Sequence, residues 1–325
     1  MTVTNTKFMD GIEKKLAEKL ADTSIKTYMS KLVILHGKKP FSSFAFLKNV
    51  KGIKTFIDAF ENLKTRRAYY ASIVSVLTHM DMDSSKTYKA TAITYRGVLA
   101  KVIENINKEP SGVKSEKQTD NWLEWEEVED VLTALSKKIK NYTKEDVDAS
   151  LMKRRMLSQH LLLSMYVLQP PRRTSDYLLL TMGDNEDDTL NWYDGNSLYF
   201  NNYKTAKTYG AVSFDVNTSV RNVLHNAIDL FGLKEGDRIM RNEDNEPFRD
   251  SSAITKTLNR IFSPKKVSTT LLRHIYLTSK YGDVKTEQQE DAVAMGHSVA
   301  TQQSTYVMKD NGRMVVKINP DEKID

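Results

Sequence analysis

The sequence contains no cysteine. This absence excludes a disulfide framework, a thiol nucleophile, a cysteine-ligated metal and an iron–sulfur cluster, and it fits a reducing compartment. No apolar run approaches the ~20 residues that cross a bilayer, and residues 1–15 lack the apolar stretch of a signal peptide. We therefore expect a protein that neither spans a membrane nor is secreted.

Motifs of nucleotide and esterase chemistry are also missing. There is no G-x-x-x-x-G-K-[ST] loop, no G-x-G-x-x-G and no G-x-S-x-G, so nucleotide hydrolysis and serine esterase chemistry have no support. The six histidines include no His-x-x-x-His pair with a carboxylate between them. We therefore expect no metal and no cofactor.

The composition is that of a globular protein with an uneven charge. Of the 325 residues, 40% are apolar and 28% charged, and this length favours two domains. Residues 1–120 carry 21 basic and 12 acidic groups, whereas residues 121–325 carry 27 basic and 30 acidic groups. The first third is therefore expected to meet a polyanion, with nucleic acid the first candidate and an anionic membrane surface the second.

Hydrophobic periodicity predicts helices through the first third of the chain. They cover residues 11–36, 53–63, 65–79 and 87–107, with Ser24 as a candidate N-cap. Residues 108–121 combine Pro, Gly, Ser and mixed charge without any periodicity. We predict a helical domain over residues 1–110, a linker over 111–121 and a second domain over 122–325.

The second domain is predicted to combine helices with a short β region. Helices are expected at about residues 126–139, 146–168 and 287–295 (the last from a Thr286–Gln289 capping box), and after Ser298. An Asp194-Gly195 turn joins two alternating runs, and residues 197–203 and 210–216 are expected to form a further strand pair. The predicted fold class is mainly α with a small antiparallel β-sheet, as a helical domain followed by an α+β domain.

One set of residues in the second domain suits a particular reaction. The set comprises Arg173, Lys204, Arg273, His297 and Tyr306. Guanidinium groups match the non-bridging oxygens of a phosphodiester and stay charged, so they stabilise a pentacoordinate phosphorus without metal. A tyrosine can attack that phosphorus and conserve the bond energy, while a lysine protonates the leaving oxygen. Each residue alone has a plainer structural interpretation, but their order and spacing favour the chemical one.

At these positions the sequence resembles the tyrosine recombinase (phage integrase) family, over about residues 121–310. The resemblance is carried by Arg173-Thr-Ser-Asp176, Lys204-Thr-Ala-Lys207, Thr270-Leu-Leu-Arg273-His274, Met295-Gly-His297-Ser298, and Tyr306 nine residues after His297. It implies a helical core-binding domain followed by an α+β catalytic domain. It also implies Tyr306 as nucleophile, the two arginines and His297 on the non-bridging oxygens, and Lys204 at the leaving 5′-oxygen.

The sequence departs from the family at one catalytic position. The family's usual histidine, three residues before the second arginine, is Thr270 here, and a threonine cannot exchange a proton near neutral pH. Proton removal from Tyr306 would fall to His297, to water, or to a lowering of the tyrosine pKa by the arginines, so slower chemistry is expected. Either Arg172 or Arg173 fits the first arginine, and the spacing to the Ser-Asp pair favours Arg173.

Other basic side chains are candidate DNA phosphate contacts. They are Lys26, Lys64, Arg66, Arg67, Arg172 and Lys207. For any single one in the first domain, a solvated helix face is an equally good interpretation. Beyond the nucleophile, residues 313–318 alternate apolar side chains and are expected to form a strand, either closing their own domain or docking on a neighbouring subunit.

The favoured function is a site-specific DNA recombinase or integrase that works through a 3′-phosphotyrosyl intermediate and a Holliday junction. The resemblance implies double-stranded DNA as partner and a homotetramer on two DNA sites, with a monomer or dimer off DNA. A type IB DNA topoisomerase and a catalytically weakened DNA-binding relative remain as alternatives. The protein is expected inside the cell, in the cytoplasm or nucleus, wherever its target DNA lies.

Overall fold

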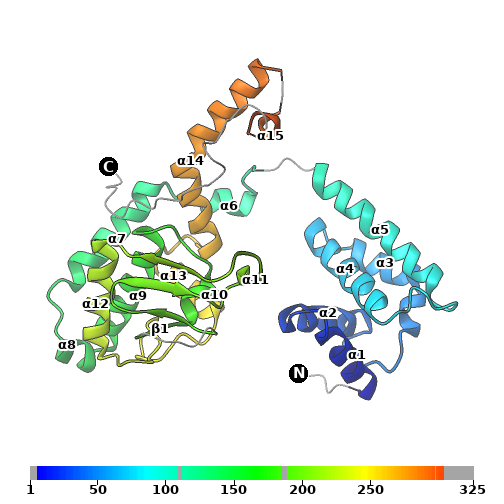
Figure 1. Cartoon of the computed structure of the whole chain (residues 1–325), viewed down its shortest axis with the longest axis horizontal. Helices are drawn as coiled ribbons and strands as arrows, with labels where there is room; N and C mark the ends of the chain where they lie inside the picture. The colour runs from blue at the N-terminus through cyan, green and yellow to red at the C-terminus, as the bar shows by residue number, and fades with distance from the viewer. Residues whose placement is uncertain (1–5, 109–111, 184–188, 297, 304–325) are drawn as a thin grey trace. The chain divides into compact units, whose positions relative to one another are not determined.

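A computed structural model describes residues 6–108, 112–183, 189–296 and 298–303 (Figure 1). Contacts divide the chain into two compact units, Met1–Val113 and Lys114–Asp325. Each unit has its own hydrophobic core. Among the described residues, no helix combines the length and the apolar character needed to cross a membrane.

The first unit is entirely helical. Its elements are α1 (Lys7–Ala17), α2 (Asp22–Leu35), the 3-10 helix η1 (Ala45–Lys48), α3 (Val50–Asp58), α4 (Leu63–His79) and α5 (Lys89–Lys108). Helix α4 is central, because it packs against the other four α-helices and completely buries Tyr70, Ile73 and Val76. The predicted cap is wrong: α2 begins after Ala21 without any side-chain cap, and Ser24 lies inside it. Packing of the buried face, and not capping, sets where this helix starts.

The segment predicted as a linker holds a short helix, α6 (Glu116–Asp120). A capping box starts it, in which Ser115 Oγ accepts from the Gln118 amide and the Gln118 side chain accepts from the Ser115 amide. Just after it, Asn121 Oδ1 accepts a hydrogen bond from Lys266 N at 2.6 Å. The later part of this segment therefore belongs to the second unit, and the connection between units is shorter than the predicted linker.

The second unit is built around one buried helix. Its helices are α7 (Trp125–Ile139), α8 (Lys144–Ala149), α9 (Leu151–Val167), α10 (Thr174–Leu178), α11 (Ala206–Tyr209), α12 (Thr218–Phe231), α13 (Ser251–Ile261), α14 (Thr269–Ala294) and α15 (Val299–Thr301). Every residue of α9 from Leu157 to Val167 is buried, because α7, α8, α12, α13 and α14 pack against this helix. Even His160 is inside, with its Nε2 3.0 Å from Ser136 Oγ.

A small four-stranded sheet completes the second unit and confirms the mainly helical fold class. Its strands are β1 (Leu180–Met182), β2 (Asn191–Tyr193), β3 (Ser197–Phe200) and β4 (Val212–Asp215), in that order. The β2–β3 and β3–β4 pairs are antiparallel as predicted. At the predicted Asp194-Gly195 turn, Asp194 Oδ1 accepts from the amides of Asn196 and Ser197.

The sheet is mixed and not purely antiparallel, because β1 pairs with β2 in parallel. Strand β1 has only three residues, too few to show an alternating pattern in the sequence. Long-range backbone hydrogen bonds fix it instead, such as Ile239 N to Leu180 O at 3.0 Å. The strand predicted over 197–203 also ends early, at Phe200, and α11 lies in the connection to β4.

Helix α14 runs for 26 residues without a break, so the predicted helix start at Thr286 is wrong. Thr286 Oγ1 donates to Gly282 O at 3.1 Å within the helix. Between Ser268 and Thr286 the sequence has no proline and a single glycine, Gly282, and one glycine costs only about 1 kcal/mol. A capping-box pattern in the middle of a helix is therefore overridden by continuation of the helix.

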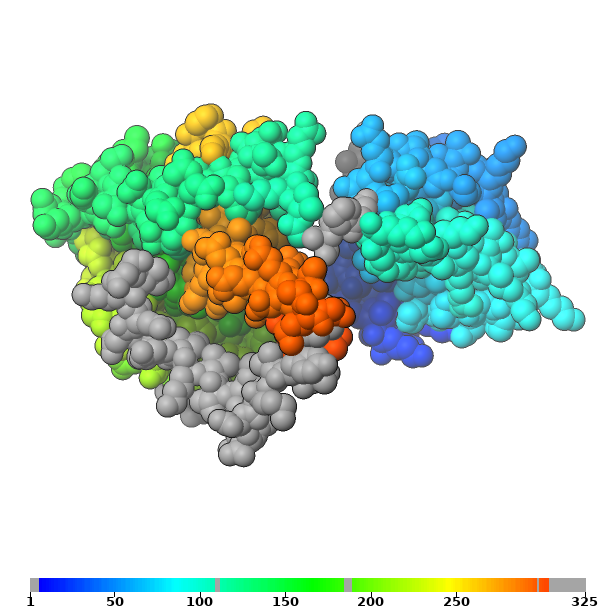
Figure 2. Space-filling model, turned by 90° about the horizontal axis from the view of Figure 1, so that it is seen from above, coloured from blue at the N-terminus to red at the C-terminus, as the bar shows by residue number. Residues whose placement is uncertain are grey.

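The second half of α14 and α15, orange in Figures 1 and 2, lie at the surface of the second unit. Ser298 caps α15 as predicted, since its Oγ accepts from Thr301 N at 3.1 Å. The side chains of Leu277, Tyr281 and Val284 are about half exposed. Helix α14 thus buries its apolar residues mainly in its first half, where the second arginine lies.

Candidate active site

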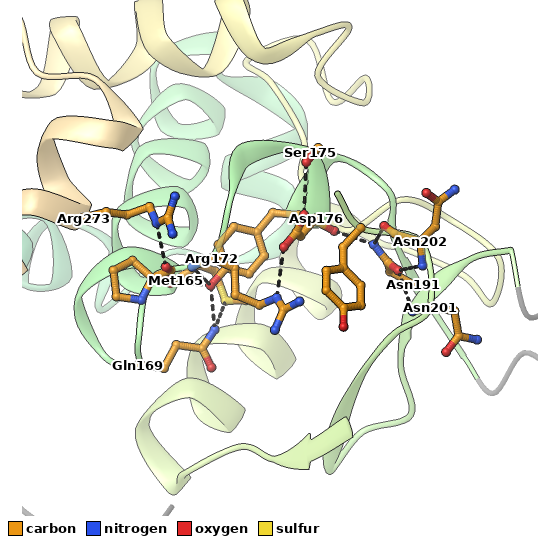
Figure 3. Close-up of polar contacts among 12 residues, drawn as sticks. Met165, Gln169, Arg172, Ser175, Asp176, Asn191, Asn201, Asn202 and Arg273 are labelled. Atoms are coloured by element: carbon orange, nitrogen blue, oxygen red, sulfur yellow. Dashed lines mark hydrogen bonds and ion pairs between the residues drawn. The ribbon is translucent and has the colours of Figure 1, made fainter. Parts of the chain in front are cut away.

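A buried tyrosine fixes the turn that carries the first arginine pair. Pro170 and Pro171 follow α9, which they cannot continue, and Tyr177 lies just beyond in α10. The Tyr177 hydroxyl donates to Met165 O at 2.9 Å and accepts from Gln169 Nε2 at 3.1 Å (Figure 3). Burial raises the pKa of Tyr177 to about 12, so the hydroxyl keeps its proton and its role as donor. The end of α9 and the start of α10 are therefore held at a fixed spacing.

Arg172 is held inside this turn. Its Nε donates to Asp176 Oδ2 at 3.1 Å, and Asp176 is only 2% exposed (Figure 3). Its guanidinium carbon lies 3.8 Å from the ring centroid of Phe200 and 5.1 Å from that of Tyr203, which are cation–π distances. Ser175 Oγ is a further partner of Asp176 at 3.0 Å. These contacts give Arg172 a structural role, and its predicted DNA contact stays a prediction.

Arg173 follows as the N-cap residue of α10, with a partly exposed side chain that makes no capping hydrogen bond. The start of α10 lies against the start of α14, where Thr174 Oγ1 and Thr269 Oγ1 are 2.7 Å apart. Arg273 Nε donates to Pro171 O at 3.2 Å, across a sequence separation of 102 residues. The structure therefore brings together the two segments that carry Arg173 and Arg273.

The first turns of α14 divide their side chains between the core and the solvent. Thr269 is buried, whereas Thr270 and His274 are exposed and Arg273 is partly exposed. Thr270 and Arg273 are three residues apart and so share one face of the helix. Thr270 therefore lies about one helical turn before Arg273.

Lys204 is exposed in the connection from β3 to α11, and Lys207 is exposed within α11. The turn before Lys204 is joined to α10 by the buried side chain of Asn191. The Nδ2 of Asn191 donates to Asp176 O at 3.0 Å, and the Oδ1 of Asn191 accepts from Asn202 N at 2.8 Å (Figure 3). The lysine turn is thus attached to the segment of the first arginine pair.

His297 and Tyr306 lie outside the described residues, as does the predicted strand over 313–318, so these assignments stay predictions. The described chain supplies three of the predicted segments, 170–178, 201–207 and 269–274. Among the described residues, no group of three or more His, Asp or Glu side chains is arranged to hold a metal ion.

Three of the basic residues predicted to contact DNA are exposed in the first unit, namely Lys26, Lys64 and Arg67. Arg66 differs, because its Nε donates to Phe60 O at 2.5 Å and its side chain is partly buried. Arg66 therefore ties α4 to the loop before it. The DNA contacts of all four residues stay predictions.

Sequence reasoning missed Asn191 and Tyr177. Asparagine is uncommon in strands, and Asn191 stands beside a Trp-Tyr pair at the edge of a turn-rich stretch, where a surface position is the ordinary expectation. Full burial of a polar side chain marks it as unusual, and that burial is visible only in the folded protein.

Comparison with known proteins gives no sequence match and only distant structural likeness. No family model matches the chain, and no curated protein matches it. A solved structure described as "Crystal structure of XerA recombinase" is 15% identical, with a TM-score of 0.35, over 93% of this chain and 94% of that one. The residues and contacts of this chain itself therefore carry the functional proposal.

Proposed function

We propose that this protein breaks and rejoins DNA strands through a tyrosine, as a site-specific recombinase. The observation that carries the proposal is the contact between the two arginine segments. Arg273 Nε lies 3.2 Å from Pro171 O, and Thr174 Oγ1 lies 2.7 Å from Thr269 Oγ1. Arg173 and Arg273 therefore come from adjoining backbone, which suits two guanidinium groups that bind one phosphodiester.

The reaction begins when the phenol oxygen of Tyr306 attacks the scissile phosphorus. A 3′-phosphotyrosyl bond forms, the bond from phosphorus to the bridging 5′-oxygen breaks, and that oxygen leaves as a 5′-hydroxyl. Arg173, Arg273 and His297 stabilise the charge on the non-bridging oxygens, and Lys204 donates the proton that the leaving oxygen takes up. Rejoining is the reverse: a 5′-hydroxyl attacks the phosphotyrosine and Tyr306 leaves.

Thr270 limits how the nucleophile loses its proton. Its hydroxyl can donate a hydrogen bond to a non-bridging oxygen, but it cannot accept and release a proton near neutral pH. The proton of Tyr306 then passes to His297 or to water. Cleavage is expected to be slower than in a Thr270→His variant.

DNA binding by the first unit completes the proposal. Residues 1–120 hold nine more basic than acidic groups, and Lys26, Lys64 and Arg67 are exposed. Bulk positive charge of this kind gives sequence-independent affinity for the phosphate backbone. Recombination also requires cleavage at paired sites, so we propose a tetramer on two DNA sites with strand exchange through a four-way junction.

A nicked duplex tests the chemistry, because the short fragment next to the nick diffuses away after cleavage and traps the covalent intermediate. A pool of such duplexes with random sequence allows for the unknown DNA site. Wild-type protein is expected to retain DNA under denaturing conditions, and Tyr306→Phe is expected to retain none. Absence of any adduct with wild type would favour the alternative of a DNA-binding protein without catalysis.

A plasmid with two copies of the recovered site separates a recombinase from a type IB topoisomerase. The recombinase is expected to give a deletion or inversion that requires both copies. A topoisomerase would instead relax supercoiled plasmid whether or not a second copy is present. Relaxation of the plasmid without any two-site product would overturn the recombinase assignment. It would still be consistent with cleavage through a phosphotyrosyl intermediate.

A further inference from the structure

One fully buried amide joins two segments of the second unit to the sheet. Asn191, the first residue of β2, has 0% exposure. Its Nδ2 donates to Asp176 O and to Asn202 O, both at 3.0 Å, and its Oδ1 accepts from Asn201 N at 3.0 Å and from Asn202 N at 2.8 Å (Figure 3). A primary amide has two donor hydrogens and two acceptor lone pairs, so its full capacity is used.

All four hydrogen bonds of the Asn191 side-chain amide are made to backbone groups of two segments. The carbonyl of Asp176 belongs to α10, directly after the arginine pair, whereas Asn201 and Asn202 form the turn that follows β3. Lys204 comes two residues after Asn202. The amide therefore holds main-chain positions on either side of the candidate site. Because its partners are backbone atoms, none of its hydrogen bonds depends on the rotamer of a second side chain.

A second contact joins the same two segments. Arg172 is paired with Asp176, and its guanidinium lies over the rings of Phe200 and Tyr203. The chain is thus anchored up to the residue before Lys204. Since the lysine side chain itself is exposed and flexible, the reach of its amine depends on where residues 201–203 place its backbone.

We propose that Asn191 is a positioning residue for Lys204, an inference that rests on the proposed function. Asn191 holds the lysine turn at a fixed place relative to the arginine segment, so the amine reaches the leaving 5′-oxygen while the arginines bind the same phosphate. Asn191 does not touch the reacting atoms and acts through Lys204 alone. A misplacement of about 1 Å in such a group costs about 10²-fold in rate.

The test compares two leaving groups at the site recovered with wild-type protein. Replacing the bridging 5′-oxygen with sulfur makes the leaving group a thiolate, whose thiol has a pKa of roughly 8.5, so it needs no proton from a lysine. Lys204→Ala is therefore expected to slow cleavage of the oxygen duplex by about 10²–10⁴-fold and to slow the sulfur duplex far less.

Asn191→Asp keeps the size of the side chain and an acceptor oxygen in place of Oδ1, but it replaces the donating NH2 group with a second acceptor oxygen. We expect it to raise the ratio of sulfur to oxygen cleavage rates at least about tenfold above wild type, in the same direction as Lys204→Ala. This ratio does not depend on the fraction of folded protein, so a partly unfolded preparation still gives a valid result.

Asn217→Asp is the matched control. The Asn217 Nδ2 donates to Leu168 O at 2.8 Å and its Oδ1 caps α12, so the variant also loses a donor, but outside the lysine turn. It should leave the ratio at the wild-type value. An unchanged ratio in Asn191→Asp overturns the positioning role and leaves the proposed function intact. No sulfur preference in Lys204→Ala, or no cleavage of either duplex by wild type, overturns the proposed function instead.

Discussion

Two adjacent arginines of the second unit have different surroundings. The side chain of Arg172 is 19% exposed and pairs with Asp176, whose side chain is 3% exposed. Arg173 is partly exposed and makes no capping hydrogen bond. We therefore propose that Arg172 stabilises the turn and that Arg173 contacts the phosphate.

Alanine at each position should separate these roles. Arg172→Ala leaves the buried carboxylate of Asp176 without its cation and is expected to lower the free energy of unfolding by about 2 kcal/mol or more. Arg173→Ala is expected to change it by less than about 0.5 kcal/mol, yet to slow covalent adduct formation by about 10²–10³-fold. Urea unfolding and adduct yield measure the two effects. A stable but inactive Arg172→Ala, with an unstable Arg173→Ala, would reverse the assignment.

At this scale the sequence shows residue types and local spacing but not long-range partners. The Ser-Asp spacing that favours Arg173 is local and can be seen in the sequence. The stacking of Arg172 on Phe200 and Tyr203, about thirty positions away, depends on where β3 lies in the sheet. The four bonds of Asn191 depend on the same placement, so no local pattern could predict them.

At the scale of single elements, α14 provides a test of where a helix begins. Ser268 Oγ accepts from Leu271 N at 3.2 Å at the start of the helix, whereas Thr286 lies inside it. Ser268→Ala is expected to lower the free energy of unfolding by about 1 kcal/mol, because it removes the cap. Thr286→Ala is expected to be neutral or stabilising by a few tenths of a kcal/mol, because alanine has the higher helix propensity. Equal destabilisation by both variants in thermal unfolding would indicate a second helix start at Thr286.

The buried end of α9 gives a prediction about pH. Burial lowers the pKa of His160 to about 4, below the roughly 6.5 expected in the unfolded chain. Between these two pH values His160 is protonated in the unfolded chain and neutral in the folded protein. The free energy of unfolding is therefore greatest above about pH 6.5 and falls as the pH drops toward 4. The total loss is about 3 kcal/mol.

His160→Gln should remove this contribution while keeping a group that can bond to Ser136 Oγ. The difference in unfolding free energy between wild type and variant, measured in urea at pH 7 and at pH 4.5, is expected to shift in favour of the variant at the lower pH. If the difference is the same at both pH values, the pKa of His160 is not lowered in the folded protein.

Long amphipathic helices were predictable because their periodicity extends over several turns, and α4, α5 and α7 occur where the pattern indicates. Short elements were not predictable in the same way. Strand β1 has three residues and is held by distant backbone groups, and α11 has four residues in a stretch expected only to connect two strands. The local pattern is informative only when an element is long enough to show its period.

At the scale of the whole molecule, the chain has two cores that share no residue. Fragments 1–113 and 114–325 are therefore expected to fold separately, each with one cooperative unfolding transition. The first fragment is also expected to bind duplex DNA with an affinity that falls steeply with salt, because its excess of basic groups displaces counterions.

Calorimetry of each fragment, and DNA titrations between low and physiological salt, measure these two properties. Within the first fragment, Arg67→Ala is expected to reduce the slope of log affinity against log salt by about 1 if the exposed Arg67 contacts a phosphate as predicted. If fragment 1–113 folds but shows no salt-dependent binding to duplex DNA, the prediction that this unit binds DNA is wrong.

The central claim is that Tyr306 forms a covalent bond with DNA, and peptide mapping of the trapped adduct tests it most directly. Wild-type protein is trapped on the duplex bearing the sulfur leaving group, digested with protease and nuclease, and the modified peptide is sequenced by mass spectrometry. We predict a single modified peptide, with a nucleotide joined through its 3′-phosphate to Tyr306, and none from Tyr306→Phe. A nucleotide on another residue, or an adduct that persists in Tyr306→Phe, would contradict the account.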